Sequence, residues 1–367
     1  MADLPLDRTP AWSVAASVLG LGLFGLLAAG VLSEASALAL LAAAALLAAS
    51  VFAAVHHAEI LALRIGEPLG SILLALAVTV IEVALIVSFM LSGSPGAEAV
   101  ARDTVFAAVM IVLNGVVGLC LVLGGRRHHE QRFRLEGASA ALAVLGTLAV
   151  VALVLPNHTV ATLGPTYSPV QLAVAASASL VLYITFVFAQ TVRHRDYFLD
   201  EATSDDETTP ARITPGRRIV AFSAVLLPAS LAAVVLLAKT LSHPLESGIA
   251  SAGLPHAVVG VVVAAIVLLP EGLAAAKAAI GNRVQGSLNL ALGSALASIG
   301  LTIPAVAAVS LFLDTSPVLG LSAENTVLLI LTLFVSTLTL GTGRTTALQG
   351  VVHLVIFAVF LLLTLVP

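Results

Sequence analysis

The chain is poor in charge, in aromatic side chains and in cysteine. Charged residues make up 10% and aromatic residues 5% of its 367 positions, whereas soluble domains carry about 25% charged residues. Its one cysteine, Cys120, excludes a disulfide framework and a cysteine-rich metal site. A formal net charge of −4 does not indicate a nucleic-acid partner. These shortages exclude a soluble enzyme and a disordered chain.

Hydrophobic residues, in contrast, make up 59% of the chain, and its mean hydropathy is +1.11. A membrane span needs about 20 mostly apolar residues, and eleven runs meet that requirement. We therefore expect an all-α polytopic membrane protein with eleven transmembrane helices, the first of them retained rather than cleaved as a signal peptide. The predicted spans are 12–32, 36–57, 68–91, 103–124, 137–156, 169–192, 218–239, 254–277, 285–311, 323–341 and 346–366.

The basic residues predict the orientation of these spans, because cytoplasmic loops carry the excess of Lys and Arg. With the N-terminus in the cytoplasm and the C-terminus outside, 14 of the 16 basic residues fall on the inside. Only Arg102 and Lys239 then lie outside. The opposite orientation would reverse this ratio.

The order of the spans suggests a duplicated arrangement. We expect residues 1–35 to supply an extra helix, and 36–192 and 218–367 to form two five-helix repeats. An odd number of spans makes the repeats face opposite ways, as in inverted-repeat transporters. The acidic stretch 193–217 joins them as a cytoplasmic linker. That linker is either a solvated connector or a weak cation-sensing segment.

Two acidic residues lie well inside predicted spans, Glu82 in the third and Glu271 in the eighth. Each occupies the second member of its repeat. A charged side chain inside a membrane is costly, so it is read first as functional. The repeat symmetry predicts that the two carboxylates meet near the midplane, as oxygen ligands suited to hard cations. The alternative is that each glutamate is a protonated, hydrogen-bonded structural residue.

Other polar residues extend this candidate site. Thr79 lies one turn before Glu82 on the same helix face, and Pro270 frees a backbone carbonyl near Glu271. Asn114 lies in the middle of the fourth span, and Glu67 lies at a cytoplasmic mouth where it could attract cations. The ninth span carries a stripe of hydroxyls, which either lines an ion pathway or only bonds to its own helix. The stripe is Ser287, Ser294, Ser298 and Thr302.

Two blocks of sequence carry a resemblance to a known family. The first runs from Val55-His-His-Ala-Glu59 through Gly66-Glu-Pro-Leu-Gly70 to Ala77-Val-Thr-Val-Ile-Glu-Val-Ala-Leu-Ile86. The second runs from Leu269-Pro-Glu-Gly-Leu273 through Asn289-Leu-Ala-Leu-Gly-Ser294 to Leu301-Thr-Ile-Pro304. They resemble the two alpha-repeats, here about 55–124 and 254–311, of the cation/calcium exchanger superfamily. The bacterial ChaA-type sodium–potassium/proton and calcium/proton antiporters are the most similar branch.

This resemblance implies an antiporter and not an enzyme. It implies that Ca²⁺, Na⁺ or K⁺ leaves the cytoplasm in exchange for H⁺ across a bacterial inner membrane. It also implies that Glu82 and Glu271 are the ion-binding acids. From the residues near them we expect Thr79, Ser294 and Ser298 to help bind the cation and protons, and we expect no cofactor. The alternatives are a passive cation channel and an antiporter of Na⁺ and K⁺ alone. The expected partners are inorganic cations, protons and lipid, and the sequence does not predict the oligomeric state.

Overall fold

The computed structural model describes residues 10–33, 36–66, 69–91, 96–199 and 215–367. Within these residues, eleven helices are long and apolar enough to cross a membrane, which confirms the predicted fold class. Glu67 and most of the acidic linker lie outside the described residues. The chain forms two compact units, and each is described by itself. Unit 1 comprises Met1–Ala97 and Thr209–Ser251, and unit 2 comprises Glu98–Thr208 and Ala252–Pro367.

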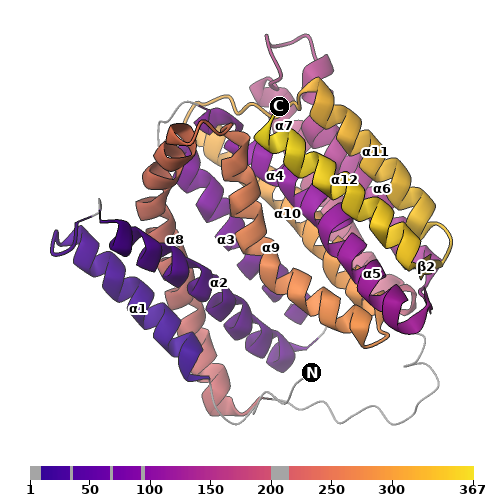
Figure 1. Ribbon diagram of the computed structural model, residues 1–367, viewed down its shortest axis with the longest axis horizontal. Coiled ribbons are helices and arrows are strands. Elements are labelled where there is room, and N and C mark those ends of the chain that lie inside the picture. The colour runs from indigo at the N-terminus through magenta and orange to yellow at the C-terminus, as the bar shows by residue number, and fades with distance from the viewer. Residues whose placement is uncertain (1–9, 34–35, 67–68, 92–95, 200–214) are drawn as a thin grey trace. The chain divides into compact units, whose positions relative to one another are not determined.

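Unit 1 contains four long helices: α1 (Ala11–Ala28), α2 (Ala37–Ile65), α3 (Leu69–Met90) and α8 (Arg217–Ser251). Helix α2 packs against the other three, and α1 and α2 can be followed side by side in Figure 1. Small side chains allow this close approach, as expected for helices in lipid. Ala43 and Ala54 of α2 are fully buried, and the Ser17 and Ser230 hydroxyls share a hydrogen bond of 2.7 Å between α1 and α8.

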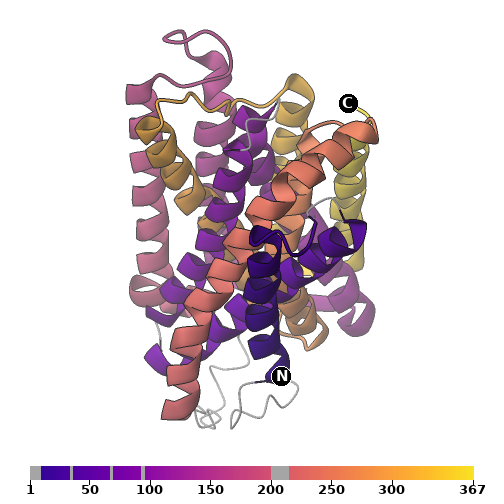
Figure 2. The same ribbon diagram turned by 90° about the vertical axis from the view of Figure 1, so that its left-hand side faces the viewer.

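Helix α8 is longer than the sequence suggested. The sequence analysis ended the seventh span at residue 239, whereas α8 continues unbroken through Pro228 and Pro244 to Ser251 (Figure 2). Lys239 therefore lies within a helix and not in a loop. A proline removes only one helical hydrogen bond, which neighbouring contacts can offset in a long helix. At 1.5 Å per residue α8 is about 50 Å long, well beyond a bilayer core of about 30 Å.

Unit 2 contains the remaining helices and two short strands. Its central helix is continuous but changes pitch, from α4 (Val100–Met110) through the π-helical η2 (Ile111–Val116) to α5 (Val117–His128). The short 3-10 turn η1 (Ala97–Ala99) leads into it. The other elements are β1 (Glu130–Arg132), α6 (Leu135–Ala149), η3 (Val150–Val154), η4 (Leu155–His158), α7 (Pro169–Phe188), η5 (Ala189–Arg193), η6 (Arg195–Phe198), α9 (Ala257–Ile280), α10 (Val284–Phe312), α11 (Ala323–Leu340), β2 (Arg344–Thr346) and α12 (Ala347–Leu365).

Glycines bring α9 and α12 against this central helix. A Cβ atom added to Gly260 of α9 would lie 2.6 Å from the backbone carbon of Asp103, so the two backbones nearly touch. On another side of the same helix, a Cβ at Gly350 of α12 would lie 2.6 Å from the carbonyl oxygen of Gly118. Figure 1 shows α12 alongside α5. Because both contacts join backbone to backbone, they set the positions of α9 and α12 within unit 2.

A small antiparallel strand pair was not predicted by the sequence analysis. Strand β1 pairs with β2 in the register Glu130 with Thr346 and Arg132 with Arg344. The Glu130 carboxylate lies 3.7 Å from a guanidinium nitrogen of each of these two arginines. The pair joins the end of α5 to the connection between α11 and α12, and so braces one end of unit 2.

We expect Gly260→Ala to destabilise the protein by about 1–3 kcal/mol, the usual cost of overpacking a close contact. Gly146→Ala on α6 is the matched control, because its added Cβ would meet only Leu333 methyl groups at 3.9 Å. Thermal unfolding in detergent, read with a thiol-reactive dye that reports exposure of the buried Cys120, measures both. Equal midpoints for the two variants would contradict the close α4–α9 contact.

Candidate functional site

Glu82 lies near the middle of α3, in unit 1. Its side chain is 3% exposed, and that of Thr79, one turn earlier, is 6% exposed. The Thr79 hydroxyl donates to the carbonyl of Ala75 at 2.9 Å, so its oxygen can still accept a hydrogen bond or coordinate a cation. Gly70 fixes the beginning of α3, because a Cβ there would lie 2.5 Å from the carbonyl oxygen of Ala62 on α2.

Glu271 lies near the middle of α9, in unit 2, and is half-buried. Pro270 directly before it lies inside the helix and has no N–H, so the carbonyl of Ile266 loses its usual helical donor. On the other side of Glu271, Gly272 packs against Val116, and a Cβ there would lie 3.2 Å from the Val116 methyl. Glu271 thus lies between a proline that removes one helical donor and a glycine in tight contact with the end of η2.

The hydroxyl stripe lies on α10, which packs against α6, α7 and α9. Ser287, Ser298 and Thr302 are buried, at 1%, 3% and 0% exposure, and Ser294 is half-buried. The Thr302 hydroxyl makes no hydrogen bond within the part of the chain that the structure describes. The stripe is therefore internal, but its role in lining a pathway stays a prediction.

Asn114 lies within the π-helical turn η2 and is fully buried. Its amide nitrogen donates to the Thr332 hydroxyl of α11 at 2.9 Å, and its amide oxygen lies 3.0 Å from Nδ1 of His353 on α12. Both ends of the amide are therefore already engaged by protein. A lining role for Asn114 stays a prediction.

Sequence reasoning missed His353 and Thr332 as partners of this asparagine. His353 is fully buried, and 239 residues separate it from Asn114. The signal for it was a single histidine inside the last apolar run, but a hydrogen bond across that distance in sequence has no local pattern. Gln285 and Asn289 at the start of α10 were also missed. They donate to the carbonyls of Tyr197 and Phe198 at 3.5 and 2.6 Å.

The elements that carry the candidate residues of unit 2 are neighbours. Glu271, Asn114 and the hydroxyl stripe lie on α9, η2 and α10, and these three elements pack against one another. Glu82 and Thr79 belong to unit 1, so their meeting with Glu271 stays a prediction. Among the described residues, no group of three or more His, Cys, Asp or Glu side chains could hold a metal ion. A cation bound at these residues would need hydroxyl and carbonyl oxygens in addition to carboxylates.

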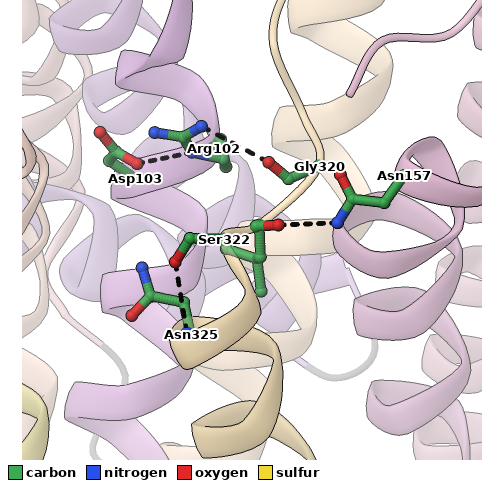
Figure 3. A network of polar contacts seen from close by, with 7 residues as sticks. Arg102, Asp103, Asn157, Gly320, Ser322 and Asn325 are labelled. Carbon is green, nitrogen blue, oxygen red and sulfur yellow. Dashed lines mark hydrogen bonds and ion pairs between the residues drawn. The ribbon is translucent and has the colours of Figure 1, made fainter. Parts of the chain in front are cut away.

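A second polar network lies at one end of unit 2 (Figure 3). Arg102 pairs with Asp103 through an Nε–Oδ1 distance of 2.7 Å, and its Nη1 donates to the Gly320 carbonyl at 3.4 Å. Asn157 donates to the Leu321 carbonyl at 2.7 Å. These bonds hold the chain just before α11 against α4 and η4.

Arg102, Asn157, Gly320 and Leu321 line an open pocket of about 670 Å³ together with residues of the loop 159–165. Tyr167, just beyond this loop, is buried and donates from its hydroxyl to the carbonyl of Val151 at 2.6 Å. Burial raises the pKa of Tyr167 to about 12, so the phenol keeps its proton and remains a donor. The network is structural: each of its polar groups holds a loop or a helix end.

Buried carboxylates in a polytopic helical protein are typical of ion transporters, and comparison with known proteins identifies the family. The sequence pattern described as sodium/calcium exchanger protein matches residues 35–192 and 222–366. The chain belongs to this family. The y4hA protein of Sinorhizobium fredii is 59% identical over 360 residues, covering 98% of this chain and 97% of that protein.

Two further proteins are similar over most of the chain. The sodium-potassium/proton antiporter ChaA of Escherichia coli is 36% identical over 312 residues, covering 85% of this chain and 84% of that protein. The crystal structure of the H⁺/Ca²⁺ exchanger CAX has a TM-score of 0.71 at 17% sequence identity, with 95% of this chain and 87% of that chain covered. This last likeness shows that the two proteins share a fold.

We expect Arg102→Ala to lower stability by about 1–3 kcal/mol, because it leaves the buried Asp103 carboxylate without its cation. Asp103→Asn in the same chain should recover part of that loss by removing the buried charge. Arg132→Ala is the control: its side chain is 72% exposed and its ion pair should contribute little. Thermal unfolding, read with the thiol-reactive dye at Cys120, measures the stability of all three variants. A loss of stability in Arg132→Ala as large as in Arg102→Ala would contradict this interpretation.

Proposed function

We propose that the chain is a secondary active antiporter that moves Ca²⁺, Na⁺ or K⁺ out of the cytoplasm of a bacterium in exchange for protons. One observation carries the proposal: each of the two segments that match the family holds one glutamate near the middle of a membrane-spanning helix. These are Glu82 in α3 and Glu271 in α9. A carboxylate at that depth is costly and is retained for a function.

The chemistry of antiport follows if the two glutamates share one site. Two ionised carboxylates repel strongly at low dielectric, so the pair must be neutralised by protons or by a cation. Both neutralise the same oxygens and so compete. A cation arriving from the cytoplasm displaces protons, and protons arriving from outside displace the cation. Two protons exchanged for one Ca²⁺ would move no net charge.

The remaining oxygens of the site come from neutral groups. We assign ligand roles to the hydroxyls of Thr79, Ser294 and Ser298 and to the backbone carbonyl that Pro270 leaves without a donor. Hard cations such as Ca²⁺ take six to eight oxygens, some of them from carbonyls and water. Three residues before each acid this chain has Thr79 and Leu268, and Leu268 offers no side-chain oxygen. Fewer side-chain ligands make the site more dependent on carbonyls and water.

A monovalent antiporter is the second candidate, and a named relative favours it. ChaA of Escherichia coli, at 36% identity, is named a sodium-potassium/proton antiporter. Two carboxylates can accept one divalent ion, or one monovalent ion with one proton. Transport with each cation supplied alone separates the two candidates.

We expect cation-dependent proton release from everted membrane vesicles that hold an acid interior, followed with a pH-sensitive dye. Ca²⁺, Na⁺ and K⁺ are added separately. Glu82→Gln and Glu271→Gln should each reduce the signal to that of vesicles lacking the protein, because a neutral amide cannot exchange a proton for a cation. Glu136→Gln is the control, since Glu136 is an exposed residue in the first turn of α6.

Full exchange in either glutamine variant would rule out the shared site. Release of protons by no cation, at any pH tested, would rule out antiport. Cation entry without proton movement would identify a passive channel instead.

The basic residues predict that the N-terminus lies in the cytoplasm. In a Cys120→Ala chain, Ala161→Cys should react with an impermeant maleimide on intact spheroplasts, because the loop 159–168 is then outside. His129→Cys should react only after permeabilisation. Ala161 and His129 are both exposed, so each thiol would be accessible from its own side. The reverse labelling pattern would overturn this orientation.

A further inference from the structure

We propose that His353 and Thr332 are positioning residues. Their hydrogen bonds hold Asn114 and the π-helical turn η2 in the conformation against which the Glu271 segment of α9 packs. In this arrangement Asn114 acts through its protein partners and not as a cation ligand. The inference rests on the proposed function, because it concerns cation binding at Glu271.

The four polar side chains of this network are almost completely shielded from solvent. Asn114, Thr332 and His353 are 0% exposed and Thr339 is 4% exposed. Asn114 contacts Thr332 at 2.9 Å and His353 Nδ1 at 3.0 Å, and His353 Nε2 contacts the Thr339 hydroxyl at 3.1 Å. Buried hydrogen bonds of this kind contribute most through the cost of leaving a partner unsatisfied.

The direction of each hydrogen bond follows from the chemistry of the groups. An amide oxygen has no hydrogen, so Nδ1 of His353 must donate to Asn114. In the neutral ring Nε2 then accepts from the Thr339 hydroxyl. Thr332 accepts from Asn114 and donates toward the sulfur of Met110 at 3.4 Å. The donors form one chain, from Thr339 to His353 to Asn114 to Thr332 to Met110.

This chain of hydrogen bonds fits a neutral histidine. A protonated ring would carry a hydrogen on both nitrogens, and the Thr339 hydroxyl would have to turn its own hydrogen away. Ionisable side chains also lie on the elements that pack against α12, but none of them is part of this hydrogen-bond chain. They are Cys120, Arg126, Arg127 and His128 on α5, Glu271 and Lys277 on α9, Glu324 on α11 and Arg344 on β2.

Helix α12 packs closely against the π-helical turn and the residues that follow it. A Cβ at Gly115 would lie 3.3 Å from the Phe357 ring, and a Cβ at Gly118 would lie 3.0 Å from the Cβ of His353. A π turn interrupts the regular helical hydrogen bonds and often marks a functional site. Asn114 lies inside this turn, so its bonds to α11 and α12 stabilise the irregular backbone.

The other side of the same helix carries the contact with α9. Val116 ends η2 and packs against Gly272, the residue that follows Glu271. One turn further along, Cys120 packs against Ala275 and Ala279 of α9. A shift of the π turn would therefore move the surface on which the Glu271 segment rests, where Pro270 already weakens the helix.

Three substitutions at His353 separate the parts of this network. The amide nitrogen of asparagine takes the place of Nδ1, and that of glutamine takes the place of Nε2. His353→Asn should therefore keep the donor to Asn114, whereas His353→Gln and His353→Leu should lose it. We expect the Ca²⁺ or Na⁺ concentration for half-maximal exchange to rise about tenfold in the Gln and Leu variants, and His353→Asn to recover to within about twofold of the original protein.

Thr332→Val tests the other end of the amide, and Thr337→Val is its matched control. Thr337 lies on the same helix, is exposed and bonds only to its own Leu333 carbonyl at 2.8 Å. We expect a several-fold rise in the half-maximal concentration for Thr332→Val and no change for Thr337→Val. The pH dependence of exchange in His353→Asn should match that of the original protein, because a positioning histidine does not carry the transported proton.

A His353→Asn variant as impaired as His353→Leu, or one with a displaced pH profile, would overturn the positioning role. So would unchanged half-maximal concentrations in the Gln and Leu variants. The thermal shift of each purified protein on adding Ca²⁺ or Na⁺ gives a second readout that also reports folding. If the original protein binds a cation but exchanges none, the antiporter proposal is wrong, and the His353 variants can still be compared by their cation binding. A protein that neither binds nor exchanges would overturn both.

Discussion

The bilayer core offers no water to the backbone, and this constraint determines much of the structure. Every N–H and C=O group in a span must find its partner within the protein, so the spans are helices. Departures from a regular helix then need support from neighbours. They occur as the π turns η2, η3 and η5 and as prolines inside α8, α9 and α10. In unit 2, the η2 turn and the Pro270 segment of α9 pack against each other, so contacts between them can stabilise both irregular segments.

Lipid gives helices no hydrophobic reason to associate, so shape and a few polar bonds hold each unit together. In unit 1, a serine pair joins α1 to α8, and His57 of α2 lies 3.2 Å from the Ser223 hydroxyl of α8. In unit 2, backbone contacts at Gly260 and Gly350 position α9 and α12. Polar bonds thus connect helices that are far apart in sequence, while glycines and alanines determine how closely they approach.

Acidic residues in the helices differ in the role that their surroundings suggest. Asp103 has a guanidinium partner in the adjacent residue, and together they hold a loop against the end of a helix. Glu82 and Glu271 lie near the middles of α3 and α9, with Thr79 one turn before Glu82 and Pro270 directly before Glu271. Hydroxyl and carbonyl oxygens near a carboxylate suit a cation that is bound and released, which is the chemistry we propose for this family member.

The sequence by itself determined the number of spans and the two candidate acids, because apolar run length and a charge inside such a run are local properties. It could not determine where α8 ends, since that helix continues past the charge of Lys239 and through Pro244. Nor could it show that α8 packs with α1, α2 and α3, or that His353 holds Asn114. Only the tertiary structure decided these packing partners, because they are contacts between residues more than a hundred positions apart.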